Sequence, residues 1–256
     1  YCSGSSINLS ANASISSGSV SKVDFYDGNT LLGTDYSSPF TYTWTNASVG
    51  SKTVRAIATS NANVVSSAAT INISVNSPTS ITPYIQTNGA SWQQQTSTQL
   101  CAGGSVSIGP QPNTSNGWSW TGPNNYTAYT RDISLSSITT SQGGRYTASY
   151  NDGTCVSSLD FNITVNPIPS APQAVTPVSY IQNAVSSYLT ATGTSLKWYT
   201  SSSGGTPSST APLPSTSTVG TTDYYVSQTT NECESQRTNI VVNVVANQLP
   251  TVSITS

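Results

Sequence analysis

Residues 159–165 read Leu-Asp-Phe-Asn-Ile-Thr-Val, a strict alternation of apolar and polar side chains. Alternation with a period of two predicts a β-strand with one buried and one exposed face. Two further segments have this character, Ala-Thr-Ile-Asn-Ile-Ser-Val at 69–75 and Asn-Ile-Val-Val-Asn-Val-Val at 239–245. An asparagine and then, within three residues, a proline follow each segment, and proline ends a strand. These pairs are Asn76 and Pro78, Asn166 and Pro167, and Asn247 and Pro250.

The three asparagines are roughly 80 to 90 residues apart, which is about the length of one β-sandwich domain. We therefore expect domains at residues 1–76, 77–166 and 167–247, with residues 248–256 forming a linker and the first strand of a following or neighbouring domain. No stretch of helical periodicity is long enough to matter. The predicted fold is all-β.

Composition excludes several classes of protein. Only 6% of the 256 residues are charged and the net charge is −2, with no basic run, so nucleic acid is not an expected partner. No apolar stretch approaches the roughly 20 residues needed to insert into a membrane. Histidine is absent, so a Ser-His catalytic triad cannot form, and no facing pair of carboxylates can be identified. We expect no enzyme activity, no catalytic residue, no metal and no cofactor, and a chain that is mature or a fragment because it shows no signal peptide.

Three regions resemble known modules. Residues 20–35, Val-Ser-Lys-Val-Asp-Phe-Tyr-Asp-Gly-Asn-Thr-Leu-Leu-Gly-Thr-Asp, with Ser-Pro-Phe-Thr-Tyr-Thr-Trp at 38–44, resemble bacterial Ig-like domains that accompany secreted carbohydrate-active enzymes and adhesins. Residues 168–246 look like Ig-like modules of very large secreted proteins of gliding Bacteroidetes, on the motifs at 189–199 and 224–228. The middle domain, with Leu-Cys-Ala-Gly-Gly-Ser at 100–105 and Trp-Ser-Trp-Thr-Gly-Pro at 118–123, is similar to another module of those proteins. The resemblance implies three tandem immunoglobulin-like β-sandwiches in an elongated rod.

Four cysteines occur, none in a CxxC pair: Cys2, Cys101, Cys155 and Cys233. Without histidine a zinc site is not expected, and disulfides place the chain outside the cytosol. We predict a Cys101–Cys155 bridge inside the middle domain, packed beside Trp120 as in immunoglobulin domains. Cys2 and Cys233 lie at opposite ends of the expected rod, beyond the roughly 7 Å that a bridge allows. They are predicted not to pair within one chain, and to be free or joined between successive copies.

Two ligand sites can be considered. Calcium would suit the oxygen-bearing side chains around one hairpin, but their spacing matches no known ligand loop, and a solvated turn is favoured. These side chains are Asp24, Asp27, Asn29 and Asp35. Exposed aromatic residues could form a platform for sugar rings, although core positions are the favoured alternative. These candidates are Trp92, Trp118, Tyr126 and Tyr129.

The last eight residues, Leu249 to Ser256, resemble the opening strand that relatives of the first domain carry and that the first domain lacks. Their alternation calls for a sheet to join, and an unpaired sheet edge is a template for another strand. The predicted donated strand is Thr251, Val252, Ser253, Ile254 and Thr255. Two head-to-tail arrangements follow: a covalent tandem repeat, which is favoured as the simpler, or separate subunits joined by strand addition.

The expected partners are therefore copies of the chain itself or adjacent domains of the same polypeptide, with polysaccharide as a further candidate. We expect a non-catalytic structural or adhesive segment of a secreted or cell-surface repeat protein, forming a stalk or filament. The alternative is a carbohydrate-binding accessory region of a secreted glycoside hydrolase. Both hypotheses place the chain outside the cell.

Overall fold

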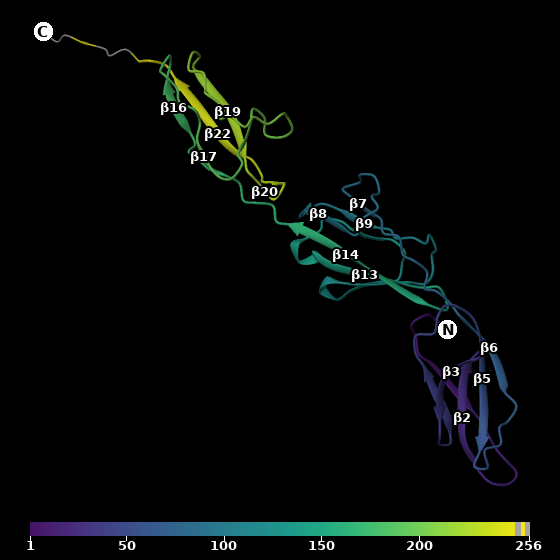
Figure 1. Cartoon of the computed structure of the whole chain (residues 1–256). Coiled ribbons are helices and arrows are strands. Elements are labelled where there is room, and N and C mark those ends of the chain that lie inside the picture. The colour runs from purple at the N-terminus through teal and green to yellow at the C-terminus, as the bar shows by residue number, and fades with distance from the viewer. Residues whose placement is uncertain (249–251, 254–256) are drawn as a thin grey trace.

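A computed structural model describes residues 1–248 and 252–253. It shows three β-sandwich modules arranged end to end in an elongated rod (Figure 1). The prediction of three tandem immunoglobulin-like β-sandwiches is confirmed. The predicted strand at 251–255 lies outside the described residues, apart from Val252 and Ser253.

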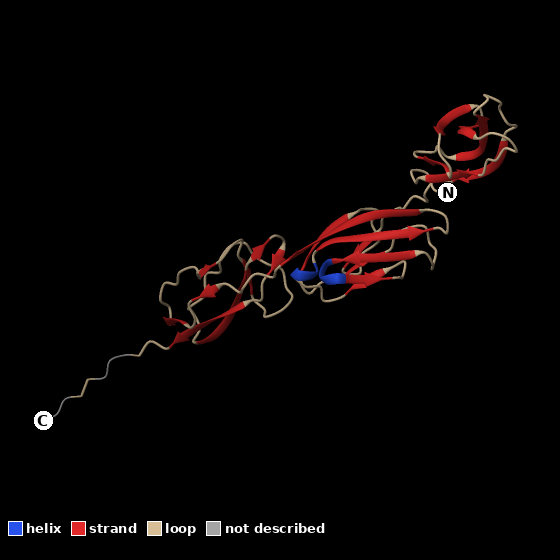
Figure 2. Cartoon of the chain, turned by 90° about the horizontal axis from the view of Figure 1, so that it is seen from below, coloured by secondary structure: helices blue, strands red, loops and turns tan. Residues whose placement is uncertain are grey.

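Helical structure in the described part is limited to two 3-10 turns of the second module (Figure 2). These are η1 (Pro123–Asn125) and η2 (Thr140–Gln142). No helix among the described residues is long and apolar enough to cross a membrane.

The first module contains six strands. Its first sheet pairs β1 with β4, and its second has the order β3-β2-β5-β6. The Asp27-Gly28-Asn29 turn joins β2 to β3, and Gly28 takes a φ of 59° that glycine adopts without steric cost. Ile7, Val23 and Phe25 are fully buried between the sheets. The strands are β1 (Ile7–Ala11), β2 (Val20–Asp27), β3 (Thr30–Asp35), β4 (Phe40–Trp44), β5 (Gly50–Ser60) and β6 (Ala69–Val75).

The second module has the largest core. Its sheets have the orders β11-β10-β13-β14-β8 and β12-β9-β7. Trp120 is buried against Phe161, with ring centroids 5.6 Å apart. The Tyr146 hydroxyl donates to the Gln142 carbonyl at 2.8 Å, which is the tyrosine corner of immunoglobulin-like folds. The strands are β7 (Ile85–Thr87), β8 (Ser97–Cys101), β9 (Val106–Ile108), β10 (Trp118–Gly122), β11 (Tyr126–Ala128), β12 (Ile133–Leu135), β13 (Gly144–Asn151) and β14 (Val156–Asn166).

The third module has shorter strands and a smaller core around Trp198, Val226 and Ile240. Its main sheet has the order β16-β22-β19-β18, and two small sheets pair β15 with β17 and β20 with β21. The strands are β15 (Gln173–Ala174), β16 (Val178–Ile181), β17 (Ala191–Thr192), β18 (Lys197–Tyr199), β19 (Gly220–Ser227), β20 (Thr229–Thr230), β21 (Cys233–Glu234) and β22 (Thr238–Val245).

The three segments that alternate in the sequence are the closing strands β6, β14 and β22. Each pairs antiparallel with the preceding long strand of its module, β5, β13 or β19. On the other side, β14 pairs in parallel with β8, and β22 in parallel with β16. The corresponding side of β6 forms the edge of its sheet. The first module therefore differs from the other two at its closing strand.

We expect Phe161→Ala to destabilise the second module by about 3–5 kcal/mol, because it leaves a cavity beneath Trp120 where the side chain has no exposed surface. Urea unfolding read from amide exchange in β13 and β14 would measure it. The matched control is Val156→Ala on the same strand, where the side chain is 58% exposed and the expected change is below about 0.5 kcal/mol. Equal effects of the two substitutions would contradict this core assignment.

Candidate functional site

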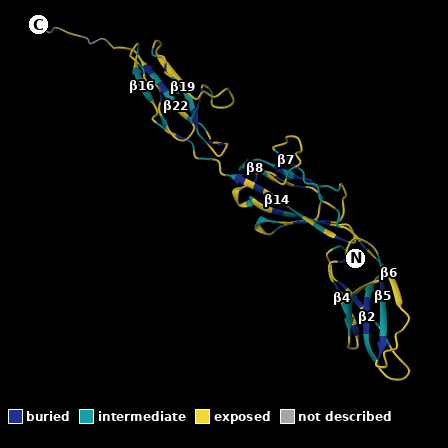
Figure 3. Cartoon of the chain, in the orientation of Figure 1, coloured by how far each residue is buried: buried dark blue, intermediate teal, exposed yellow. Residues whose placement is uncertain are grey.

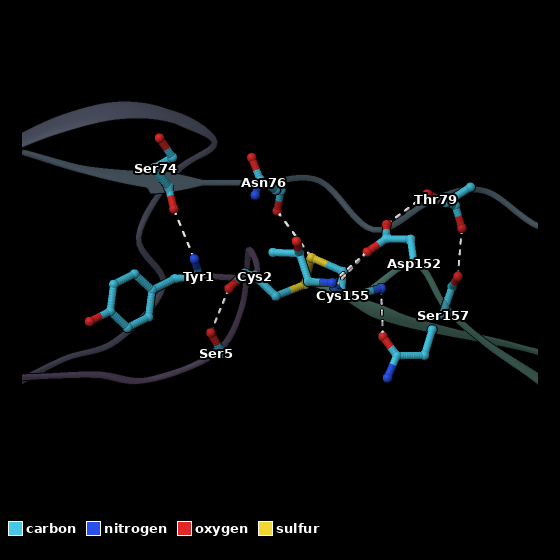
Figure 4. The surroundings of a disulfide bond; sticks show 12 residues. Tyr1, Cys2, Ser5, Ser74, Asn76, Thr79, Asp152, Cys155 and Ser157 are labelled. Atoms are coloured by element: carbon cyan, nitrogen blue, oxygen red, sulfur yellow. Dashed lines mark hydrogen bonds between the residues drawn. A yellow bond between two sulfur atoms is a disulfide. The ribbon is translucent and has the colours of Figure 1, made fainter. Parts of the chain in front are cut away.

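A disulfide between Cys2 and Cys155 joins the first module to the second (Figure 4). The two Cα atoms are 5.2 Å apart, within the range that a bridge requires. Cys2 pairs in parallel with Asn76, at the end of the first module, and the Ser3 N–H donates to the Asn76 carbonyl at 2.8 Å. Cys155 is buried and lies in the hairpin between β13 and β14. The bridge thus links the ends of two sandwiches.

The turn that presents Cys155 is organised by Asp152. Its Oδ1 accepts hydrogen bonds from the backbone N–H groups of Thr154 and Cys155, at 2.9 and 2.8 Å. Its Oδ2 accepts from the hydroxyl of Thr79, in the linker between the modules, at 2.8 Å. Because these bonds favour the charged form, the backbone N–H of Cys155 first among them, they lower the pKa of Asp152 below its ordinary value. One carboxylate therefore holds both the cysteine turn and the linker (Figure 4).

The second junction carries a disulfide between Cys101 and Cys233, with Cα atoms 5.6 Å apart. Cys101 ends β8, where it pairs with Asn166 of β14, and the Ala102 N–H donates to the Asn166 carbonyl at 2.9 Å. Cys233 is fully buried in the β20–β21 hairpin of the third module. The Asn166 side chain also donates to the Asn231 carbonyl across the junction at 3.2 Å.

The residue after Cys233 fixes its hairpin to the sheet. Glu234 accepts hydrogen bonds from the Ser227 hydroxyl at 2.6 Å, from the Tyr199 hydroxyl at 2.5 Å and from the Lys197 ammonium at 3.0 Å. Partial burial alone would raise the pKa of Glu234, but these three donors outweigh it and lower the pKa to about 2. The guanidinium of Arg237 lies over the ring of Tyr199, with its Cζ atom 3.3 Å from the ring centroid.

Both junctions have the same construction. The earlier module supplies a cysteine from the segment that pairs in parallel with the end of its closing strand, Cys2 at Asn76 or Cys101 at Asn166. The later module supplies a cysteine from the hairpin that leads into its own closing strand. The hydrogen bond to the asparagine carbonyl also recurs, from Ser3 or Ala102. The junction is therefore a repeated structural device.

The predicted Cys101–Cys155 bridge is wrong. Cys155 precedes β14 and Cys101 lies beside its last residue, so the eleven residues of β14 separate them by about 35 Å. The other two cysteines are neither free nor joined between copies, because each pairs with a cysteine of the second module. The narrower expectation that Cys2 and Cys233 do not pair with each other agrees with the structure. Phe161, not a disulfide, packs beside Trp120.

A signal for the correct pairing is present in the sequence. Residues 1–5 read Tyr-Cys-Ser-Gly-Ser, and residues 100–105 read Leu-Cys-Ala-Gly-Gly-Ser. Cys155 and Cys233 instead follow turn residues, in Asp-Gly-Thr-Cys and Asn-Glu-Cys. The four cysteines thus fall into two kinds, and each observed bridge joins one of each kind. Comparison of these local motifs indicates the observed pairing, whereas the disulfide of immunoglobulin domains suggested a bridge within the middle domain.

The predicted aromatic platform does not form as expected. Trp118 is buried and packs against Tyr150 in a tilted arrangement with ring centroids 4.8 Å apart, so its place in the platform is wrong. Tyr126 is half-buried with its ring edge-on to Tyr146. Trp92 and Tyr129 are exposed, but neither belongs to an aromatic pair in the described part of the chain.

The hairpin considered for calcium has protein partners for its oxygen atoms. Asp24 is bonded to Lys22 and Thr34, and burial, which raises its pKa, is outweighed by these bonds, which lower it. Asp35 accepts from the backbone N–H of Thr41 at 2.7 Å, which lowers its pKa. The remaining members also have cationic neighbours, Asp27 with Lys52 and Asn29 with Arg55. These contacts support the structural interpretation of the turn.

Two known families match parts of the chain. The bacterial Ig domain matches residues 1–56, and the Ig-like domain described as CHU_C associated matches residues 169–245. The chain carries tandem bacterial Ig-like modules. These matches cover regions in which the sequence motifs had indicated such modules.

Solved structures resemble the chain at low identity, and no curated protein matches it. The fibronectin(III)-like modules of Clostridium thermocellum CbhA are 28% identical over 29% of this chain and 82% of theirs, with a TM-score of 0.28. A fragment of the titin I-band is 12% identical over 96% of this chain and 94% of its own, with a TM-score of 0.36. Three N-terminal domains of the highly immunogenic outer capsid protein of bacteriophage RB49 are 11% identical over 97% of this chain and 96% of theirs, with a TM-score of 0.38.

Peptide mapping of the oxidised protein under non-reducing conditions should yield two cross-linked pairs, one holding Cys2 and Cys155 and the other holding Cys101 and Cys233. Both pairs should separate on reduction. A peptide pair holding Cys101 and Cys155 would contradict the structure.

The stability of the third module should depend on pH through Glu234. Its pKa of about 2 in the folded state lies below the ordinary 4.5, so its contribution is complete above pH 4.5 and is lost as the pH falls through 2. Since the side chain is 34% exposed, we expect a loss of only about 1–2 kcal/mol after screening by solvent. Denaturant titrations at pH 5 and pH 2, read from amide exchange in β22, would measure it. Glu234→Gln should remove most of this drop, while the control Asp223→Asn should keep it.

Proposed function

We propose that the chain is a tension-carrying structural segment, or stalk, of an extracellular repeat protein that projects an adhesive or catalytic partner. The observation that carries this proposal is the disulfide at each of the two junctions. Such bonds persist in oxidising surroundings and hold neighbouring sandwiches together covalently. Such bonds stabilise the fold by restricting the unfolded chain, and their position at the junctions adds a covalent link between neighbouring sandwiches.

The bridges lie outside the three cores. None of the hydrophobic clusters contains a cysteine, so each sandwich has its own packing without them. Contacts made by the linkers support the same alignment, since the Ser157 hydroxyl donates to the Thr79 carbonyl at 2.6 Å and the Gln228 amide to the Ser170 carbonyl at 2.6 Å. The disulfides therefore lie at the junctions between the modules, outside the three core clusters.

The bridges also shorten the covalent path through the chain. From Tyr1, the shortest path passes through Cys2 to Cys155, back along the chain to Cys101, across to Cys233 and then on to residue 256. This path contains about 80 residues, which limits full extension to about 280 Å at ~3.5 Å per residue. The strands of the first module, β1 to β6, therefore do not belong to this shortest path.

Force-extension measurements on single chains, held at residues 1 and 256, test whether the disulfides limit the extension of the chain, as a tension-carrying segment requires. The fully unfolded oxidised chain should reach about 280 Å and the reduced chain about 900 Å. The paired substitution Cys101→Ser and Cys233→Ser should allow about 360 Å, and Cys2→Ser with Cys155→Ser about 430 Å. An oxidised chain that extends as far as the reduced one would overturn the proposal.

A further inference from the structure

A groove opens along one side of the first module. It has a volume of about 550 Å³ and lies between β1 on one wall and β5 and β6 on the other. Leu9, Val23, Phe25 and Val54 form its floor, and no charged side chain lines it. The other lining residues are serines, asparagines, alanines, Tyr1 and Ile71. A groove of this chemistry suits an uncharged, partly apolar chain.

Both walls of the groove are strands with an unpaired edge. Among the described residues, β1 pairs only with β4, and β6 pairs along its length only with β5. The outer edge of β6 is covered near its end alone, where the Tyr1 amine donates to the Ser74 carbonyl and Cys2 pairs with Asn76. The edge from Ala69 to Ile73 therefore presents free backbone groups, which can bind an added strand.

The other two modules carry added strands on parts of these edges, with β8 along Asn162 to Asn166 and β16 along Val242 to Val245, which correspond to residues 72–76 and 73–76 of the first module. In the second module, β9 carries β7 in antiparallel pairing and β14 carries β8 in parallel. In the third, β17 carries β15 and β22 carries β16, with the same directions. Cys2 opposite Asn76 and Cys101 opposite Asn166 mark equivalent positions, so β6 corresponds to β14. Among the described residues, no strand pairs with the outer edge of β6 at residues 72–73 or with the outer edge of β1, where the neighbouring modules carry one.

The unfilled edge leaves an apolar side chain in solvent. Ile71 of β6 is 56% exposed, whereas its counterparts, Phe161 in β14 and Ile240 in β22, are fully buried. Most of β6 is exposed, while β14 and β22 bury alternate residues (Figure 3). A strand laid along β6 would cover this isoleucine.

We propose that this groove is a strand-acceptor site and that its occupant is the segment 249–256 of a neighbouring copy of the chain. The segment would run parallel to β6 and antiparallel to β1, as β8 and β7 run in the second module. This deepens the proposed function, on which it rests, by naming the contact through which one stalk segment continues into the next.

The segment has the chemistry of the groove. Leu-Pro-Thr-Val-Ser-Ile-Thr-Ser carries no charge and alternates apolar Val252 and Ile254 with small hydroxyl residues. Its eight residues span about 27 Å when extended, and the seven residues of β6 about 23 Å. Pro250 lies near its start, where a strand can tolerate a missing donor.

Segment 249–256 cannot reach the groove of its own chain, so a segment 249–256 bound there comes from another copy. β22 ends at Val245, at the opposite end of the rod from β6 (Figure 1). The residues after Val245 reach at most about 40 Å, while β14 and β22, which lie between, together span about 60 Å. Strand addition of this kind propagates from copy to copy and does not close.

A graft tests the acceptor site in the full-length chain. Residues 249–256 are placed before Tyr1 through a Gly-Gly linker, and amide exchange is measured in β1 and at Ala69–Ile73 of β6. We expect exchange at least about tenfold slower than in the ungrafted chain, because the free edges become hydrogen-bonded. The matched control graft carries Val252→Asp and Ile254→Asp, and should give no protection. Equal exchange with both grafts would overturn the proposal.

Substitutions in the groove provide a second test. Ile71→Glu should remove the protection given by the graft, whereas Leu31→Glu, at a 53% exposed position on the far edge strand of the same sheet, should keep it. Both side chains are exposed, so neither change threatens the fold. Protection that survives Ile71→Glu would place the strand elsewhere and contradict the site.

The ungrafted chain identifies how the neighbour is joined. Concentration-dependent polymers that Ile71→Glu abolishes support separate subunits, and a monomer whose graft is protected supports a covalent repeat. Polymers that persist in Ile71→Glu count against the proposal. The force-extension values depend on the disulfides alone, so the acceptor site and the stalk function can fail independently.

Discussion

The parallel pairing of a short segment with the end of a closing strand determines how this rod is built. At Asn76 and at Asn166 the paired residue is a cysteine, and the next residue donates its N–H to the asparagine carbonyl. This register places a thiol at the end of one sandwich, facing the hairpin of the next. If the pairing slipped by one residue, the cysteine would point to the other face of the sheet, and the bridge could not form. The covalent continuity of the three modules therefore depends on backbone register.

The same pairing register shows which modules a disulfide of this type can join. The position in the third module that corresponds to Cys101 is Ile181, opposite Val245. The hairpin of the first module that corresponds to those of Cys155 and Cys233 lies between β5 and β6 and contains no cysteine. A bridge of this type can thus join the three modules to one another but cannot join them to a fourth. Contacts beyond these three modules would need another chemistry, such as the strand addition proposed for the open edges of β1 and β6.

Much of the fold could be predicted from the sequence, because period-two alternation and the following prolines are local signals. The closing strands, the Asp27-Gly28-Asn29 hairpin and the buried Trp120 all follow from such signals. The disulfides could not be predicted in this way, because they depend on which ends of the modules meet. Trp118 and Trp120 share a strand face, and only the packing of Tyr150 over Trp118 shows that both are internal. Local pattern thus predicted the sandwiches, while the candidate site depends on contacts between them.

The bridges and the open groove together have a mechanical consequence. Tension that enters at Tyr1 passes through Cys2 to Cys155 and reaches the second module without crossing the first. The first module has an incomplete sheet edge and an exposed Ile71, so its folding free energy draws on fewer strand pairings than that of the second. An incomplete edge lowers the load that a module can bear before it unfolds. Because the Cys2–Cys155 disulfide diverts a load that enters at Tyr1, the open edge of the first module does not weaken the rod along that path.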